Sequence, residues 1–389
     1  MAPQNKLENE MMSRRRVLQF LAMGAGAAAT APFLAGCASD KPSGAASSAV
    51  TSTASKAAPK AASKATWDGN PLTLVTWGGT TQDGMKSAIA DPFTAATGIA
   101  TRVTSPVDYG KYTAQMQANA VTWDWVDVEG FFAVQNPTLW ASLKDKVTFD
   151  AGDAIQLPGA AQTSTDWGLP APSYAFAIAY RTDNAGPHPK TWSEFFDPKA
   201  IPGKRSIYNW PYGMLEVALL ADGVAFKDLY PLNIDRALKK LDTIKKDVIF
   251  WNSGAELQQQ LTTNAAPFVF AWNNRVTSLA RAGQPVALEW GQNLQDSGYW
   301  VTAKNGPHVN QMMDFFSYSM TTDAQKNMAV ATGYSPATKS GFAAIADDLK
   351  PWYNVAPANL SKSVGVIDLA WWAKNYDEAT TKWNTWAGA

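Results

Sequence analysis

The hydrophobic and polar positions of this chain alternate between strand-like and helix-like spacing from residue 72 onward. Between residues 72 and 128 the order is strand–helix–strand–helix–strand, with strands at 72–77, 101–104 and 125–128 and helices at 83–97 and 109–120. Gly78-Gly79 ends the first strand, and Gly98 ends the first helix. This order predicts a parallel sheet with helices on its faces, in which ligands bind beyond the carboxyl ends of the strands.

The same order recurs in the second half of the chain. We expect strands at 203–207, 267–272 and 286–290, and helices at 214–222, 255–263 and 273–282. The C-terminal third is predicted to be helical, at 308–320, 322–332, 341–349 and 367–386. Two α/β units followed by helices predict an α/β fold with two lobes. The strand ends of the first unit lie at Trp77–Thr80 and Glu129–Phe132.

The N-terminal pattern differs from that of the body. Arg14-Arg15-Arg16 precedes an uncharged run, residues 17–39, that is rich in Ala and Gly and too weakly hydrophobic for a stable membrane span. The run contains Leu34-Ala35-Gly36-Cys37, and Cys37 is the only cysteine of the chain. The segment resembles a twin-arginine export signal that ends in a bacterial lipobox, which predicts a signal peptide at 1–37 and a lipid on Cys37. The alternative is a buried apolar helix with a basic start.

Residues 38–67 consist almost entirely of Ala, Ser, Thr, Lys and Pro. Such a segment cannot bury enough apolar surface to order itself, so we expect a flexible tether and a folded body that begins near Trp67. Together the signal and the tether predict a body outside the cytoplasmic membrane, in the periplasm or at the cell surface, anchored to a membrane through the lipid on Cys37.

Composition narrows the class of function. Residues 1–67 carry eight of the 33 Lys and Arg residues but only three of the 33 Asp and Glu residues, so the body is mildly acidic and nucleic acid is not an expected partner. One cysteine and two histidines exclude an intrachain disulfide and argue against a structural zinc site. The 17 tryptophans are typical of proteins that hold organic ligands between aromatic walls.

The sequence contains no motif that indicates an enzyme. Cys37 belongs to the lipobox, no G-x-S-x-G elbow occurs, and Gly78-Gly79 lacks the spacing of a dinucleotide-binding loop. His188 lies in a Gly-Pro-His-Pro turn and His308 begins a helix, so we expect both to face solvent. We therefore predict no catalytic residues, no metal and no cofactor.

A series of short motifs resembles the periplasmic solute-binding proteins of the spermidine/putrescine type. The chain shares with them an opening strand that ends in Thr76-Trp77-Gly78-Gly79, followed by Phe93-Thr94-Ala95-Ala96-Thr97-Gly98-Ile99. Further matches follow in order at 123–128, 169–170, 191–198, 202–205, 251–255, 271–273, 333–336 and 371–372. Singly these motifs are weak, but their collinear order covers residues 70–389.

This resemblance implies a two-lobed periplasmic-binding-protein fold of the type II kind, with mixed sheets flanked by helices and the ligand in the cleft between the lobes. Lobe one would comprise 68–172 plus 298–342, and lobe two 173–297 plus 343–389. The lobes would close on the ligand by a hinge. An ABC permease and its ATPase would be the partners of a monomeric receptor.

The resemblance also implies a site with aromatic walls around an alkyl chain and carboxylates at ammonium ends. Its candidate residues are Trp77, Thr80, Glu129, Phe131, Glu216, Trp272, Tyr299, Trp300 and Tyr334. Glu129 and Glu216 would bind the ammonium groups, and Trp77 and Trp272 would stack on the ligand. Each has a structural alternative, because an aromatic side chain also suits a core or hinge and an acid also suits a solvated surface.

Two departures from the family pattern bear on the ligand. An acid often found three residues before Glu216 is replaced by Gly213. For a second family acid two alternatives stand: Asp296 substitutes for it with a shift in position, or the carboxylate is absent. Fewer carboxylates favour a putrescine-like amine, or a ligand with one cationic end, over longer polyamines. The alternative is the same receptor architecture for an opine, a sugar or an amino-acid derivative, and Arg275 with Asn273-Asn274 beside Trp272 keeps that alternative open.

Overall fold

The computed structural model describes residues 62–160 and 166–388 of the 389-residue chain. These residues belong to one compact unit, Lys56–Ala389. The predicted signal peptide, its lipidation site Cys37 and most of the predicted tether lie outside the described residues. None of the described helices is both long enough and apolar enough to cross a membrane.

Nine strands of the described chain form one mixed sheet in the order β2-β1-β3-β8-β4-β7-β5-β6, with β9 paired to β8. Three parallel strands make up one end of the sheet: β1 (Leu72–Val75), β2 (Thr101–Thr104) and β3 (Trp125–Glu129). Three more make up the other end: β5 (Arg205–Tyr208), β6 (Val248–Trp251) and β7 (Phe268–Trp272). We call these ends, with their helices, lobe one and lobe two.

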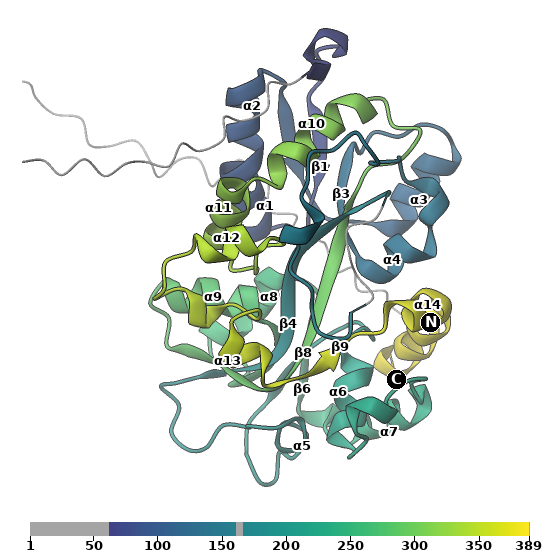
Figure 1. Ribbon diagram of the computed structural model, residues 1–389. Coiled ribbons are helices and arrows are strands. Elements are labelled where there is room, and N and C mark those ends of the chain that lie inside the picture. Colours follow the sequence, from purple (N-terminus) through teal and green to yellow (C-terminus); the bar gives the residue numbers. More distant parts are fainter. Residues whose placement is uncertain (1–61, 161–165, 389) are drawn as a thin grey trace, which may run out of the picture. The chain divides into compact units, whose positions relative to one another are not determined.

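Two long strands connect the lobes. β4 (Leu169–Arg181) and β8 (Val286–Val301) pair with each other in antiparallel fashion and run through both lobes (Figure 1). The end of β8 pairs with β3 of lobe one, and the middle of β4 pairs with β7 of lobe two. The register between β4 and β8 shifts between Pro170 and Ser173, and β9 (Ser363–Val366) adds to β8 in parallel. The predicted lobe boundaries stay a prediction.

Lobe one carries a continuous helical segment over residues 80–97, made of α1 (Thr80–Met85), a π-helical turn (Lys86–Ala90) and α2 (Asp91–Thr97). It ends at Gly98, whose φ of 72° lies in the left-handed region that glycine adopts without strain. The remaining helices are α3 (Tyr109–Gln117), α4 (Gly130–Gln135), α10 (Val309–Ser319), α11 (Thr322–Thr332) and α12 (Lys339–Ala343). Trp125, Trp300 and Phe315 pack with Phe93 in the core of this lobe.

Lobe two holds α5 (Trp192–Phe195), α6 (Met214–Ala221), α7 (Ile234–Asp242), α8 (Gly254–Thr262), α9 (Asn273–Arg281), α13 (Pro357–Leu360) and α14 (Leu369–Gly388). Its apolar core continues across to lobe one, because Phe131 of α4 stacks on Tyr376 of α14 with ring centroids 4.6 Å apart. Short 3₁₀ turns occur at Ala62–Thr66, Pro137–Leu139, Ala151–Asp153, Phe226–Asp228, Lys245–Asp247 and Lys350–Trp352.

The structure corrects several predicted boundaries. The predicted strand 286–290 extends to Val301, and the predicted helix 341–349 is the shorter α12. β4, β6, α4, α7, α13 and β9 were not predicted at all. The predicted strand ended before Gly291, whereas β8 continues beyond a kink at Gln292, whose φ of 59° is positive.

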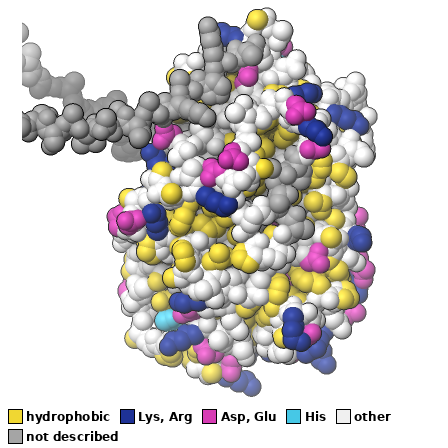
Figure 2. All heavy atoms as spheres, viewed as in Figure 1, with side chains coloured by type: hydrophobic (Ala, Val, Ile, Leu, Met, Phe, Trp, Pro, Cys, Tyr) yellow, Lys and Arg dark blue, Asp and Glu magenta, His cyan; other side chains and the backbone are white. Residues whose placement is uncertain are grey.

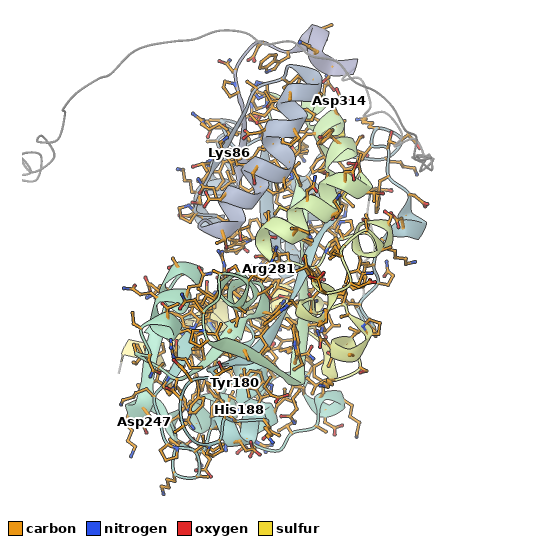
Figure 3. All side chains as sticks on the ribbon, turned by 90° about the vertical axis from the view of Figure 1, so that its left-hand side faces the viewer. Lys86, Tyr180, His188, Asp247, Arg281 and Asp314 are labelled. Carbon is orange, nitrogen blue, oxygen red and sulfur yellow. The ribbon has the colours of Figure 1, made fainter. Side chains whose placement is uncertain are left out.

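One of the two histidines lies elsewhere than expected. His308 is 8 % exposed, and its ring lies between the carboxyl groups of Asp124 (2.8 Å) and Asp68 (3.2 Å). His188 lies next to Tyr180 (Figure 3), and the two rings stack with their centroids 3.7 Å apart. The prediction that His308 faces solvent was therefore wrong, because acids distant in sequence enclose it.

The last residues of the predicted tether are attached to the body. The backbone N–H and the hydroxyl of Ser63 both donate to Asp314 of α10, at 3.0 and 2.5 Å. Gln311 donates its amide to the Ser63 carbonyl at 3.1 Å. The part of the predicted tether that the structure describes, residues 62–67, thus belongs to the folded body.

Candidate functional site

The carboxyl ends of the strands in the two lobes face each other along the connecting strands. Glu129, at the end of β3, is opposite Gly298 of β8. Trp272, at the end of β7, is opposite Phe176 of β4, and Phe176 is opposite Leu294 of β8. Four residues of an extended strand separate these two positions, which corresponds to roughly 13 Å. The predicted ligand-binding edge of each lobe therefore borders one shared region.

A buried acidic pair occupies the middle of this region. Tyr174 and Asp296 are direct cross-strand partners on β4 and β8, so their side chains lie on one face of the sheet. The Tyr174 hydroxyl lies 2.9 Å from Oδ2 of Asp296 and 3.0 and 3.1 Å from the two carboxyl oxygens of Glu129. Glu129 is 5 % exposed and Asp296 is fully buried.

Burial changes the acidity of these carboxyl groups. It raises the pKa of Glu129 well above the usual range, and the neighbouring Asp296 and Asp127 raise it further. Burial also raises the pKa of Asp296 to about 7, although the hydrogen bond from Tyr174 opposes the shift. Asp127, two residues before Glu129, has a pKa raised to about 8 by the same cause. A cationic group would stabilise the ionised form of these acids.

Aromatic rings surround the end of β7. The indole of Trp272 makes edge-to-face contacts with Trp251 at 4.8 Å and Tyr208 at 4.9 Å, measured between ring centroids. The Tyr174 ring contacts Trp272 at 6.4 Å and Tyr334 at 6.0 Å in the same way. These rings form an apolar wall with polar edges, which suits a small organic ligand.

A buried arginine lies at the start of α9 and connects the lobes. Arg275 is 1 % exposed, and its guanidinium donates to the Thr80 hydroxyl at 3.0 Å and to the Gly78 carbonyl at 3.2 Å, both in lobe one. Farther along α9, Arg281 donates to the Val330 carbonyl of α11 at 2.5 Å (Figure 3). α9 thus attaches lobe two to lobe one on this side.

Several polar atoms at the β7–α9 junction have no hydrogen-bond partner among the described residues. They are the Trp272 indole nitrogen, both amide atoms of Asn274 and Nε of Arg275, and all are buried. Buried polar groups are almost always paired, so such a group of unpaired atoms indicates where a ligand or water binds. The junction therefore presents N–H donors and an amide, together with the positive charge of Arg275.

The structure brings together some of the predicted site residues. Trp77, Thr80, Glu129, Trp272 and Tyr334 border the shared region, and Trp77 contacts Tyr109, whose hydroxyl accepts the Glu129 backbone N–H at 3.1 Å. Their role as ligand contacts stays a prediction.

Other predicted site residues have structural partners. Phe131 packs against Tyr376 and Tyr212 between α4 and α14. Trp300 lies in the lobe-one core against Trp125, and Tyr299 packs on Trp167. The Glu216 carboxylate accepts from the Tyr230 hydroxyl at 2.8 Å and from the Trp372 indole at 2.6 Å.

The sequence also left site residues unassigned. Tyr174 and Tyr208 were missed, and Asn274 and Arg275 were considered only for the alternative of an opine, a sugar or an amino-acid derivative. Tyr174 lies in β4, which was not predicted, so nothing placed it opposite Asp296. Gly213 has a clear structural reason: a Cβ there would lie 2.8 Å from the Phe176 ring, which excludes an acid at this position.

Across residues 62–160 and 166–388, no group of three or more His, Cys, Asp or Glu side chains is arranged to hold a metal ion. Acidic and basic side chains are interspersed over the face shown in Figure 2 rather than gathered by sign. The site therefore offers hydrogen bonds, aromatic contacts and charges of both signs.

Comparison with known proteins identifies the family. Residues 88–358 match the model of the bacterial extracellular solute-binding protein family, which is more than half of the chain. The chain belongs to this family. A solved structure described as the Atu4243–GABA receptor is 37% identical, with a TM-score of 0.73, and the match covers 82% of this chain and 98% of that one. Family and fold are thus confirmed.

Two further relatives bear on the ligand. The γ-aminobutyric acid-binding protein of Pseudomonas aeruginosa is 28% identical over 81% of this solute-binding protein and 90% of its own length. The binding protein AgtB of A. tumefaciens R10, solved with agropinic acid, is 27% identical with a TM-score of 0.73, over 82% of this chain and 99% of that one. These relatives are transport receptors for small solutes and not enzymes, and their names do not specify polyamines. The polyamine type stays unconfirmed.

Proposed function

We propose that this solute-binding protein captures a small zwitterionic amino acid of the γ-aminobutyrate type and delivers it to an ABC permease. The observation that carries the proposal is the presence of opposite buried charges in one aromatic region. Arg275 supplies a guanidinium with an unpaired Nε, while Glu129 and Asp296 supply carboxyl groups. A ligand with a carboxylate at one end and an ammonium at the other is complementary to both.

The pKa values of two tyrosines in the aromatic wall support the presence of both charges close to it. Burial raises the pKa values of Tyr208 and Tyr334, Glu129 raises both further, and Arg275 lowers both. Each of these tyrosines is therefore within electrostatic reach of the acid and of the guanidinium. An ω-amino acid, whose charges are separated by a short alkyl chain, carries one group for each.

The same arrangement disfavours a diamine. The second ammonium of putrescine would have to leave water and approach the buried guanidinium of Arg275, which carries a charge of the same sign. Desolvating a charge without a partner of opposite sign is costly. The relatives whose names specify γ-aminobutyrate support the same reading.

Isothermal titration of the exported protein with γ-aminobutyrate, putrescine, spermidine, glucose and agropinate would test the proposal. We expect γ-aminobutyrate to bind more tightly than either polyamine. Tight putrescine binding without a γ-aminobutyrate response would contradict the amino-acid assignment. Preference for agropinate would support a larger amino-acid conjugate, for which the AgtB relative gives precedent.

Arg275→Met provides the matching test of the site. Removing the partner of a buried carboxylate costs about 2–5 kcal/mol, so affinity for γ-aminobutyrate should fall at least about 30-fold. Arg236→Met removes an arginine from the exposed surface of α7, where it pairs with Asp222, and should leave affinity unchanged. Equal affinity in Arg275→Met and wild type would exclude Arg275 as the carboxylate partner.

The family is an extracellular one, which fits a periplasmic or cell-surface location. Export by the twin-arginine route, the lipid on Cys37 and closure of the lobes around the ligand are part of the proposal.

A further inference from the structure

A single hydroxyl group connects the two buried acids of the site. Tyr174 lies within 2.9–3.1 Å of Asp296 and of both carboxyl oxygens of Glu129. A phenol carries one hydrogen, so it can donate to only one of the two carboxyl groups at a time. The other short oxygen–oxygen contact needs a hydrogen from the carboxyl group itself. One proton shared between Glu129 and Asp296 would supply that hydrogen.

The titratable groups around Glu129 and Asp296 do not supply a positive charge that would compensate two ionised carboxyl groups. Asp127 on β3 acts on Glu129, and Glu216 on α6 acts on Asp296, and both are acids. The other titratable neighbours are tyrosines from several elements: Tyr109, Tyr208, Tyr212, Tyr334 and Tyr376. Arg275 acts on Tyr208 and Tyr334, while its Nη atoms bond to lobe one. Two adjacent negative charges in such surroundings favour retention of one proton.

Asp296 also borders a second space. It lines a cavity of about 380 Å³ together with Ser297, Tyr230, Asp368, Leu369 and Lys227. The side chain of Lys227 is 81% exposed, so the cavity reaches the protein surface. Glu129, Tyr174 and Asp296 thus form a hydrogen-bonded path from the end of β3 to a solvent-connected cavity.

We infer that ligand capture is coupled to proton release: the ammonium group of the ligand replaces the proton shared by Glu129 and Asp296, and that proton leaves through Tyr174 and Asp296 into the cavity. The inference rests on the proposed function. Before binding, the pair holds one negative charge and one proton. Afterwards it holds two negative charges beside one ammonium group, and one proton has entered the solvent, so charge and atoms balance.

This coupling gives the receptor a defined pH dependence. When the pair is protonated, each binding event must expel a proton, so affinity falls by up to tenfold for each unit by which the pH is lowered. At a pH where the pair has already ionised, binding releases no proton and affinity becomes independent of pH.

Calorimetric titration with γ-aminobutyrate in two buffers of different ionisation enthalpy measures the proton count directly. Between about pH 5 and pH 7 we expect release of close to one proton per ligand in the wild type. In Asp296→Asn the amide can donate toward Tyr174, so Glu129 ionises without a shared proton and release should fall toward zero. Asp348→Asn, which changes an exposed acid between α12 and α13, should retain full release.

Infrared spectroscopy of the ligand-free protein tests the proton without any ligand. Near neutral pH the shared proton should add one carbonyl band of a protonated carboxyl group, present in the wild type and in Asp348→Asn and lost in Asp296→Asn, to the bands of Asp127 and Glu216, whose pKa values are also raised. Binding of γ-aminobutyrate with no proton release would overturn the coupling, as would absence of the band. If γ-aminobutyrate does not bind, the proposed function fails, and the infrared band alone then decides whether the shared proton exists.

Discussion

Glu216 shows how differently one acid can be interpreted from sequence and from structure. Its position at the start of α6 suggested an ammonium partner, yet its side chain is fully buried and hydrogen-bonded to Tyr230 and Trp372. Burial raises its pKa to about 7, although these two hydrogen bonds oppose the shift. We therefore propose that Glu216 holds the α6–α14 contact within lobe two rather than a ligand.

Glu216→Gln tests this role through pH. The folded protein binds the Glu216 proton more tightly than the unfolded chain does, so ionising this group costs stability. The cost is absent below the pKa of an unfolded glutamate, about 4.3, and is complete above about 7. Between about pH 4 and pH 8 the wild type should therefore lose roughly 3 kcal/mol of unfolding free energy relative to Glu216→Gln. Urea denaturation measures this difference, and the exposed Glu378→Gln should show none.

At the scale of elements, the outer strands and their helices were predictable because each has a clear apolar period. β2 and α11 were predicted with their observed bounds. The connecting strands β4 and β8 were not predictable over their full length, because their hydrophobic and polar positions reflect burial between neighbouring strands and not an apolar period. In β8 three polar residues, Asn293, Gln295 and Asp296, are buried, and β8 is hydrogen-bonded to β4, β9 and the segment around Asn354. Sequence could place Glu129 and Trp272 at strand ends but not Tyr174 between them.

The pairing of β3 with β8 positions Glu129, and Gly298 permits that pairing. A Cβ at residue 298 would collide with the Val128 carbonyl oxygen. Gly298→Ala should thus cost about 1–3 kcal/mol of stability, as overpacked sites do, and should weaken ligand binding because the end of β3 shifts. Gly110→Ala, at an exposed position in the first turn of α3, should be neutral or stabilising. Thermal unfolding and titration of both variants would check this, and a Gly298→Ala protein as stable as Gly110→Ala would contradict it.

At the scale of the whole molecule, the lobes contact each other on two sides of the connecting strands. On one side α9 bonds to lobe one through Arg275 and Arg281, and on the other α4 packs against α14 through Phe131 and Tyr376. If the lobes separate when the ligand leaves, both contacts must break, so each contributes to the measured affinity, and the α4–α14 contact does so without touching the ligand.

Tyr376→Leu tests this contribution of closure. The substitution keeps an apolar side chain but removes the stack on Phe131 and the hydroxyl that accepts the Trp210 indole N–H at 3.1 Å. An aromatic pair contributes about 0.5–1.5 kcal/mol, so γ-aminobutyrate affinity should fall about two- to tenfold. Small-angle scattering should show compaction of the wild type on ligand addition, and Tyr376→Leu should need more ligand for the same compaction.

Lys374→Ala, at an exposed position of α14, is the control for Tyr376→Leu. Unchanged affinity in Tyr376→Leu would mean that α4 and α14 stay in contact in the ligand-free protein, because only a contact that forms on closure can change the binding free energy.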